Sequence, residues 1–520
     1  MLCPFSRTLG DLLAENAIVR KDNLAVISAD RQVTFGELHA KASGVAHRLR
    51  AEGVSRGDRI GLLVSNRVEW LEISFGALML GAVIVPFSTW STKAELAFLI
   101  KDSKIKILFS LVTFGERDFL PDLRDAVTNG LTAILVGAEE RTEFARYEDL
   151  PHAADLTVPP GEGPSAGDDA LVLYTSGSTS IPKAVRLKHY GIIENAFNIG
   201  ERQGLLQTDR VFLSAPLFWA YGGCNALAAT FTHGACLVLQ EKFEAGEAIN
   251  LIEKHQCSAI YTLPAMTTAL LHHAHFAPER TASLRTGLTI GSEEEFLRTA
   301  EKLGVPQLCN IYGSTETYGN CAVTWHYWPL DKRARSQGEP LPGQKIRIRD
   351  IDTGSILPSN NQGLIEVLGY VTPGYAGESQ ALNSGLFTED GFYITGDVGC
   401  LNDEGVLVFS GRNTEMIKRA GINVSPAEIE SALLRLDQVS EAAVVGIPDD
   451  NQGECIIAFV VPDSFADPPN INTLFDQLRI QLSKYKIPDL VKFCEKLPLK
   501  ATGKLDRNQL KEDATILISG

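Results

Sequence analysis

Leu171-Val-Leu-Tyr-Thr-Ser-Gly-Ser-Thr-Ser-Ile-Pro-Lys-Ala-Val185 is the segment on which the interpretation of this 520-residue chain is built. Its apolar start predicts a buried strand, and the apolar residues after Lys183 predict a second one. Between them lie a glycine that permits close backbone approach and several hydroxyl groups, namely Thr175, Ser176, Gly177, Ser178 and Thr179. Hydroxyl and amide donors beside a lysine charge are suited to phosphate oxygens, so we predict a phosphate-binding loop. A solvated serine-glycine linker is the alternative.

Composition limits the remaining possibilities. The chain has 48 Lys and Arg against 64 Asp and Glu, a formal charge of −16, which argues against a nucleic-acid partner. Its nine cysteines are scattered and form no Cys-x-x-Cys pair, and the first residues show no secretory signal, so we expect reduced thiols and a cytoplasmic location. The uncharged stretch 73–92 is interpreted as a buried helix ending near Gly81 and a core strand, residues 82–86, so no integral membrane span is expected.

Helical and strand patterns alternate through most of the chain, which is typical of parallel sheets covered on both faces. Shorter runs at 345–368 and 405–410 resemble an antiparallel subdomain, and helices are expected at 426–436 and 471–482 before a polar tail. We therefore predict an α/β fold with two domains. Residues 1–410 would form a large N-terminal domain of parallel βα-layered sheets plus a small β-subdomain. Residues 411–520 would form a small mobile C-terminal α+β domain.

Two further motifs carry groups suited to a nucleotide. In Asn310-Ile-Tyr-Gly-Ser-Thr-Glu316, the Tyr312 ring can stack on a base, Thr315 can donate to a phosphate and Glu316 can hold Mg²⁺. Asp397, which ends Tyr393-Ile-Thr-Gly-Asp397, and Arg412 together suit ribose hydroxyls. A polar turn and an ordinary ion pair are the alternatives for the two motifs.

In this order and spacing the motifs resemble those of the adenylate-forming superfamily, and the chain is similar to its acyl- and aryl-CoA ligases over nearly its whole length. The resemblance implies that Asn310 and Tyr312 meet the adenine, with Gly291, Ser292 and Glu293 covering its other side. It further implies that Thr315 contacts the α-phosphate, Glu316 ligates Mg²⁺, and Asp397 and Arg412 hold the ribose.

The resemblance also assigns roles in the C-terminal region. Leu497-Pro-Leu-Lys-Ala-Thr-Gly-Lys504 matches the terminal motif whose lysine bridges the carboxylate and the α-phosphate, so Lys504 is the expected catalytic lysine together with Thr315 and Glu316. Thr414 occupies the hinge position, usually Asp or Lys. Ala420 and Gly421 lie in the segment that lines the coenzyme A tunnel.

The acyl pocket is expected at Ala215-Pro-Leu-Phe-Trp-Ala-Tyr-Gly-Gly223, with Trp219, Tyr221 and Gly222 as pocket residues together with Gly313. A tryptophan replaces the usual histidine at position 219, and Ser180 and Ala184 replace two usual glycines of the phosphate loop. No acidic residue here could pair with an ammonium group, which favours a plain carboxylic acid over an amino acid as substrate.

The expected reaction is ATP-dependent: the acid is activated as an acyl-adenylate with release of pyrophosphate, and the acyl group passes to coenzyme A. ATP, Mg²⁺ and coenzyme A are the implied cofactors. Two alternatives stay open, transfer to the phosphopantetheine of an acyl carrier protein and a non-catalytic nucleotide-binding relative. Aliphatic, aryl and polycyclic acids all stay open as the substrate.

Overall fold

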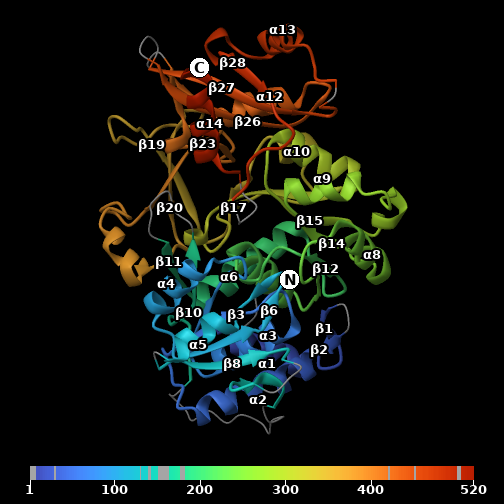
Figure 1. Cartoon of the computed structure of the whole chain (residues 1–520), viewed down its shortest axis with the longest axis vertical. Helices are drawn as coiled ribbons and strands as arrows, with labels where there is room; N and C mark the ends of the chain where they lie inside the picture. Colours follow the sequence, from blue (N-terminus) through green and yellow to red (C-terminus); the bar gives the residue numbers. More distant parts are fainter. Residues whose placement is uncertain are drawn as a thin grey trace.

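A computed structural model describes residues 8–28, 31–128, 130–138, 142–149, 163–175, 182–419, 422–449, 453–465, 467–500 and 505–519. In Figure 1 the blue-to-green N-terminal part lies below and the orange-to-red C-terminal part lies above it. No helix among these residues is both long enough and apolar enough to cross a bilayer.

The first of two large sheets has nine strands and is parallel at its centre. Its order is β18-β17-β16-β15-β14-β12-β13-β1-β2, with the pairs from β16 through β1 parallel and the outer pairs antiparallel. The bounds, in that order, are Glu339–Pro340, Ala322–Val323, Gln307–Tyr312, Thr286–Thr289, Ala259–Tyr261, Arg210–Leu213, Cys236–Leu239, Leu24–Ile27 and Gln32–Thr34.

The second large sheet has eight strands in the order β21-β11-β10-β4-β3-β5-β8-β9. Pairs from β10 through β9 are parallel, whereas β11 and β21 are antiparallel additions at one edge. The bounds, in that order, are Tyr375–Ala376, Lys183–Lys188, Asp169–Thr175, Val83–Pro86, Arg59–Leu63, Ile107–Leu111, Thr132–Val136 and Ala145–Arg146. Burial of continuous apolar strands such as β8 agrees with cover on both faces.

Helices and both sheets share one hydrophobic cluster, which contains Leu62 of β3, Leu213 of β12 and the helical residue Leu71. The helices of the N-terminal part are α1 Leu9–Val19, α2 Phe35–Ala51, α3 Val68–Met79, α4 Lys93–Ser103, α5 Leu120–Thr128, α6 His189–Gln203, α7 Leu227–Thr232, α8 Ala245–His255, α9 Pro264–His272, α10 Glu293–Leu297 and α11 Leu330–Ala334. Thr34 begins α2 with a reciprocal capping box to Glu37, as its position before an amphipathic run predicts.

Two smaller sheets complete the fold. An antiparallel sheet contains β19 Lys345–Arg349, β20 Gly363–Leu368, β22 Tyr393–Leu401 and β23 Leu407–Arg412. The C-terminal sheet contains β24 Ile417–Arg419, β25 Ile422–Val424, β26 Val439–Asp449, β27 Gly453–Pro462 and β28 Leu490–Phe493, with helices α12 Pro426–Leu434, α13 Ile471–Gln481 and α14 Arg507–Ser519. The predicted α/β fold class is confirmed. The boundary at 410/411 stays a prediction, although β23 ends at Arg412 and β24 begins at Ile417.

One prediction about the C-terminal region is wrong. The expected polar tail is the helix α14, and Leu510 and Ala514 on it are buried in an apolar cluster with strands β26 and β27. These two apolar residues are four positions apart and therefore share one helix face. The mostly polar composition of the segment hides this short apolar stripe.

Candidate active site

The phosphate-loop motif lies at one end of the β10–β11 hairpin. Thr175, the last residue of β10, pairs with Lys183, the first residue of β11, so the intervening residues must connect two neighbouring strand ends. The predicted loop residues Ser176, Gly177, Ser178 and Thr179 lie outside the described residues, as does Ser180. The predicted arrangement of strand, loop and strand is confirmed, while the contacts of the loop itself stay a prediction.

Lys183 and Glu316 meet at a tyrosine that the motifs did not include. The Lys183 ammonium lies 5.5 Å from the centre of the Tyr375 ring. The Tyr375 hydroxyl donates a hydrogen bond of 2.9 Å to Glu316 Oε1, and the Glu316 carboxylate is largely buried. The first and second motifs, far apart in the sequence, are therefore neighbours.

A second contact joins the second and third motifs. The Tyr312 hydroxyl donates to Asp397 Oδ2 at 2.7 Å, and Arg412 Nε lies 3.5 Å from Asp397 Oδ1. Asp397 and Arg412 are directly opposite each other on β22 and β23, which fixes their pairing. Since Tyr312 and Glu316 are only four residues apart, the three motifs form one cluster.

Burial controls the protonation of this cluster. It raises the pKa of Asp397, against the opposing effect of the Arg412 charge. Burial, followed by the charge of Asp397, holds the pKa of Tyr312 well above its ordinary value. Burial, followed by the charge of Glu316, does the same for Tyr375 and for Tyr393. The Tyr312 and Tyr375 hydroxyls are therefore hydrogen-bond donors to the Asp397 and Glu316 carboxylates at neutral pH.

The predicted adenine-covering segment forms the start of helix α10. Gly291 has φ +134°, and a Cβ at this position would lie 2.5 Å from Glu295 Oε2. Ser292 and Glu295 form a capping box, and Glu293 pairs with Arg335 at 2.7 Å.

Asn310 is fully buried within strand β16, two residues before its end. Its side-chain nitrogen donates to Arg333 O at 3.3 Å, and its side-chain oxygen accepts from the amide of Ile311 at 2.9 Å. Thr315 opens a short turn of 3₁₀-helix, Thr315–Thr317, which carries Glu316. The adenine and phosphate contacts of these residues stay predictions.

Three of the predicted acyl-pocket residues, Trp219, Tyr221 and Gly222, lie on the π-helix η2 Ala220–Ala226 or directly before it, whereas Gly313 directly follows strand β16. The Tyr221 hydroxyl donates to Thr262 O and Leu288 O, so its ring sits at the carboxyl ends of strands β14 and β15. Trp219 packs edge-on against Trp90, with ring centroids 5.4 Å apart. A Cβ at Gly222 would lie 2.2 Å from Pro216 O, and one at Gly313 would lie 2.4 Å from Gly319 O, so both positions need glycine.

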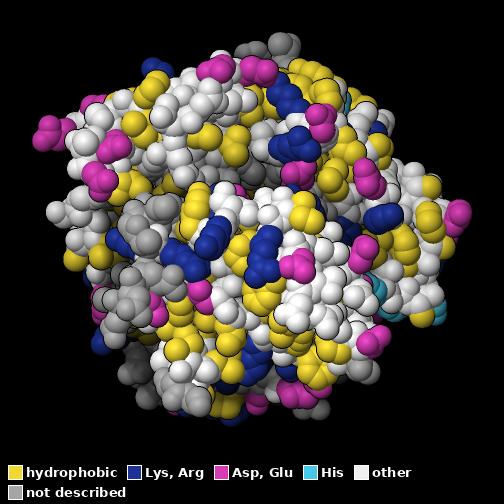
Figure 2. All heavy atoms as spheres, turned by 90° about the horizontal axis from the view of Figure 1, so that it is seen from above, with side chains coloured by type: hydrophobic (Ala, Val, Ile, Leu, Met, Phe, Trp, Pro, Cys, Tyr) yellow, Lys and Arg dark blue, Asp and Glu magenta, His cyan; other side chains and the backbone are white. Residues whose placement is uncertain are grey.

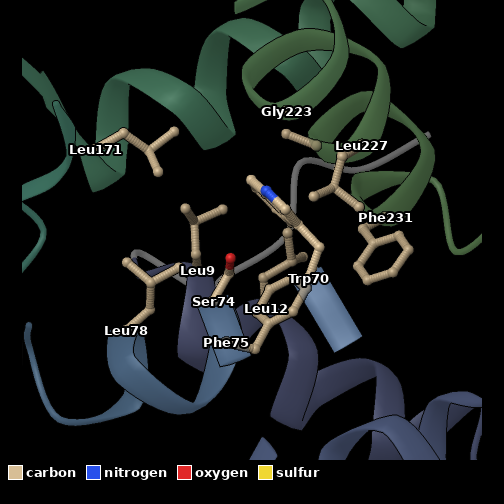
Figure 3. Close-up of a pocket in the computed structure, with 11 residues that line it drawn as sticks. Leu9, Leu12, Trp70, Ser74, Phe75, Leu78, Leu171, Gly223, Leu227 and Phe231 are labelled. Atoms are coloured by element: carbon tan, nitrogen blue, oxygen red, sulfur yellow. The ribbon is translucent and has the colours of Figure 1, made fainter. Parts of the chain in front are cut away.

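A small cavity of about 20 Å³ lies behind η2 (Figure 3). Trp70 and Ser74 line it, and the indole nitrogen of the first and the hydroxyl of the second have no hydrogen-bond partner among the described residues. Its lining includes Gly223, the last residue of the stretch expected to form the acyl pocket, but none of the predicted pocket residues themselves. The other lining residues are apolar except for Gly223, and a space of this size has room for about one water molecule, so it is too small to be the acyl pocket.

The C-terminal residues of the prediction are only partly described. Thr414 is exposed in a short 3₁₀-helix, η7 Asn413–Glu415, between strands of two different sheets. Ala420, Gly421 and Lys504 lie outside the described residues. The C-terminal region contacts the adenine-covering helix through Arg435, whose guanidinium lies 2.8 Å from the Glu294 carboxylate.

Comparison with known proteins establishes the family. The model of the AMP-binding enzyme family matches residues 13–376, and that of the AMP-binding enzyme C-terminal domain matches residues 428–504. This chain belongs to the AMP-binding enzyme family. The predicted superfamily and enzyme class, an AMP-forming acid–thiol ligase, are confirmed.

Three relatives illustrate the similarity. A 2-succinylbenzoate–CoA ligase of Bacillus licheniformis is 30% identical over 96% of this chain and 98% of its own length. The structure of the anthranilate CoA ligase AuaEII with anthranoyl-AMP has a TM-score of 0.88 at 25% identity, covering 99% of both chains. ATP-bound MatB from Rhodopseudomonas palustris has a TM-score of 0.85 at 27% identity, covering 97% of this chain and 98% of its own.

Proposed function

We propose that this enzyme converts a carboxylic acid without an ammonium group to its coenzyme A thioester, at the site formed by the three clustered motifs. In the first step a carboxylate oxygen attacks the α-phosphorus of ATP and pyrophosphate leaves. In the second step the coenzyme A thiol, losing its proton, attacks the acyl carbon and AMP leaves. AuaEII bound to anthranoyl-AMP supports such an intermediate for this architecture.

The observation that carries the proposal is the pair of contacts Lys183–Tyr375–Glu316 and Tyr312–Asp397–Arg412. They bring two cations, two carboxylates and the Tyr312 ring from the three motifs into one cluster, together with Tyr375. A nucleoside triphosphate requires this set of groups. Although the chain is acidic overall, several Lys and Arg side chains gather near the middle of the face seen from above (Figure 2).

Each residue has a role in this proposal. Lys183 neutralises phosphate charge, Thr315 donates to the α-phosphate, and Asp397 with Arg412 accepts and donates at the ribose. Bound Mg²⁺ would neutralise phosphate charge. Glu316 fits this ion, because it offers a buried, hydrogen-bonded oxygen ligand and Mg²⁺ commonly takes one or two carboxylates plus substrate phosphates.

The C-terminal region supplies the remaining roles. Lys504 stabilises the charge that develops as the carboxylate approaches the α-phosphate. A swing about Thr414 then withdraws Lys504 and brings Ala420 and Gly421 to the path of the thiol. The acid lies against Tyr221, Trp219, Gly222 and Gly313.

Pyrophosphate release over a panel of aliphatic and aryl acids, with and without coenzyme A, tests the proposal. Lys504→Ala should lose adenylate formation from acid and ATP but still form thioester from synthetic acyl-adenylate. Lys500→Ala is the matched control, since Lys500 is exposed on the same segment, and it should behave as wild type.

Three results would contradict parts of this account. Undiminished adenylation in Lys504→Ala would remove the role of Lys504. Thioester formation only on a carrier-protein phosphopantetheine would replace coenzyme A as acceptor. Absence of pyrophosphate release with every acid would favour a non-catalytic relative.

A further inference from the structure

Tyr375 lies between two groups that the proposed function assigns to the triphosphate. Its hydroxyl donates to Glu316 Oε1 at 2.9 Å, and the Lys183 ammonium lies 5.5 Å from the centre of its ring. Its exposed fraction is 2%, so solvent competes with neither contact. One side chain thus contacts both the expected metal ligand and the expected phosphate-loop lysine.

The backbone around Tyr375 is held on two sides. The two-residue strand β21 pairs with β11, where Tyr375 is opposite Val185, two residues beyond Lys183. On the other side the Asn383 side chain accepts from Tyr375 N at 2.7 Å and donates to Tyr375 O at 3.1 Å. The strand pairing and the Asn383 contacts therefore fix the position of the ring relative to the phosphate-loop hairpin.

We infer that Tyr375 is a positioning residue for adenylation, which holds the Glu316 carboxylate through its hydroxyl and the Lys183 ammonium through its ring. This inference rests on the roles of Glu316 and Lys183 in the proposed function. A carboxylate with one oxygen engaged by a rigid donor has less freedom to rotate away from a metal ion. A cation within about 6 Å of a tyrosine ring centroid is attracted to the ring face.

The electrostatics of the site agree with the donor role. A phenol hydroxyl carries its proton at neutral pH, so Tyr375 donates and the Glu316 carboxylate accepts. Tyr393, also buried, belongs to the same cluster.

Tyr375→Phe tests the hydroxyl while keeping the ring. The readout is the Mg²⁺ concentration that gives half-maximal pyrophosphate release at saturating ATP and acid. Because losing a partner that orients a metal ligand typically weakens metal binding 10- to 100-fold, we expect this concentration to rise by about that factor. A merely structural role would lower the rate equally at all Mg²⁺ concentrations.

Tyr370→Phe is the matched control. Tyr370 lies five residues earlier, and its hydroxyl also donates to a carboxylate, Glu194 Oε2 on helix α6, at 2.6 Å. It should leave the Mg²⁺ dependence unchanged. Tyr375→Leu, which also removes the ring, should in addition raise the KM for ATP above that of Tyr375→Phe.

Glu316→Gln separates failure of this inference from failure of the proposed function. If Glu316→Gln changes the Mg²⁺ dependence and Tyr375→Phe stays within twofold of wild type, the positioning role is overturned alone. If Glu316→Gln also stays at the wild-type value, the metal role of Glu316 and the inference both fall. Thermal unfolding of each variant checks that the compared proteins are folded.

Discussion

Asp397→Asn tests ribose recognition at the point where two motifs meet. The substitution keeps the shape of the side chain but replaces the carboxylate, which accepts from the Tyr312 hydroxyl and faces Arg412, with a neutral amide. The Asp397 side chain is 9% exposed, so solvent screens its interactions little. Loss of the Asp397 charge should therefore appear mainly as weaker ATP binding.

The expected size follows from the hydrogen bonds that the carboxylate would accept from the two ribose hydroxyls. A hydrogen bond to a charged group contributes about 1 kcal/mol more than a neutral one. Two such bonds correspond to about 2 kcal/mol, and 1.4 kcal/mol is a factor of ten, so the KM for ATP should rise about 30-fold.

The assay is the initial rate of pyrophosphate release at varied ATP and saturating acid. Wild type should discriminate against 2′-deoxy-ATP more strongly than Asp397→Asn does, because the hydrogen bond from the ribose 2′-hydroxyl to residue 397 is weaker in the variant. The matched control is Asp403→Asn, an exposed position in the turn at the opposite end of the β22–β23 hairpin, which accepts only from Asn360 in the contacts described.

The ionisation of Asp397 should also make the KM for ATP depend on pH. Burial raises the pKa of Asp397 above its ordinary value of 3.8, and the ionised form is the one that accepts from the ribose. As pH falls through this raised pKa, the wild-type KM for ATP should increase, whereas that of Asp397→Asn should not show this component. A KM in Asp397→Asn within twofold of wild type would refute the ribose assignment.

Three other predictions concern stability and the movement proposed for the C-terminal region. Burial lowers the pKa of His189 from 6.5 to about 4, so the unfolded state binds a proton at higher pH than the folded state does. The free energy of unfolding should therefore fall by up to about 3 kcal/mol between pH 6.5 and 4. Measured by urea unfolding at several pH values, this fall should be smaller in His189→Gln, and an equal fall would contradict the prediction. Gly222→Ala should destabilise the protein by about 1–3 kcal/mol in urea unfolding, because its Cβ would clash with Pro216 O. Gly167→Ala, with open space around its Cβ, should lie within about 0.5 kcal/mol of wild type. Equal stability of the two variants would exclude the close packing of Gly222 against Pro216 O. Arg435→Ala removes the half-exposed ion pair to Glu294, and in single-turnover assays it should change the ratio of the adenylation and thioester-forming rates by up to about fivefold, with a larger change at low salt. Arg479→Ala, which breaks an ion pair within α13, is the control. An equal ratio in the two variants would show that the Arg435–Glu294 contact does not influence the movement of the C-terminal region.

Local patterns in the sequence predicted the elements whose apolar residues follow one period. The helices predicted at 426–436 and 471–482 are α12 and α13, whose observed ends lie within two residues of the predicted ones. The helix and strand predicted in the stretch 73–92 are α3 and β4, separated by Gly81 at φ +77°. In α14, by contrast, two apolar residues on one face decide the structure within a mainly polar segment.

The candidate site was predicted motif by motif, but its connections were not. Tyr375 lies 59 residues after Glu316 and on a strand of two residues, which leaves no periodic signal. Only the pairing of β21 with β11 brings it to Lys183. The π-helix η2 was not predicted, because Gly222 and Gly223, which permit its close approach to Pro216 and Leu217, look like helix-breaking residues in the sequence.

The most direct measurement follows the oxygen atoms of the acid. With a substrate acid labelled with ¹⁸O in its carboxylate, complete turnover with ATP and coenzyme A should place label in the phosphate group of AMP, because the attacking oxygen stays on phosphorus when the thiol displaces AMP. Label in inorganic phosphate with ADP as the second product, or thioester formation without label in AMP, would contradict an acyl-adenylate intermediate.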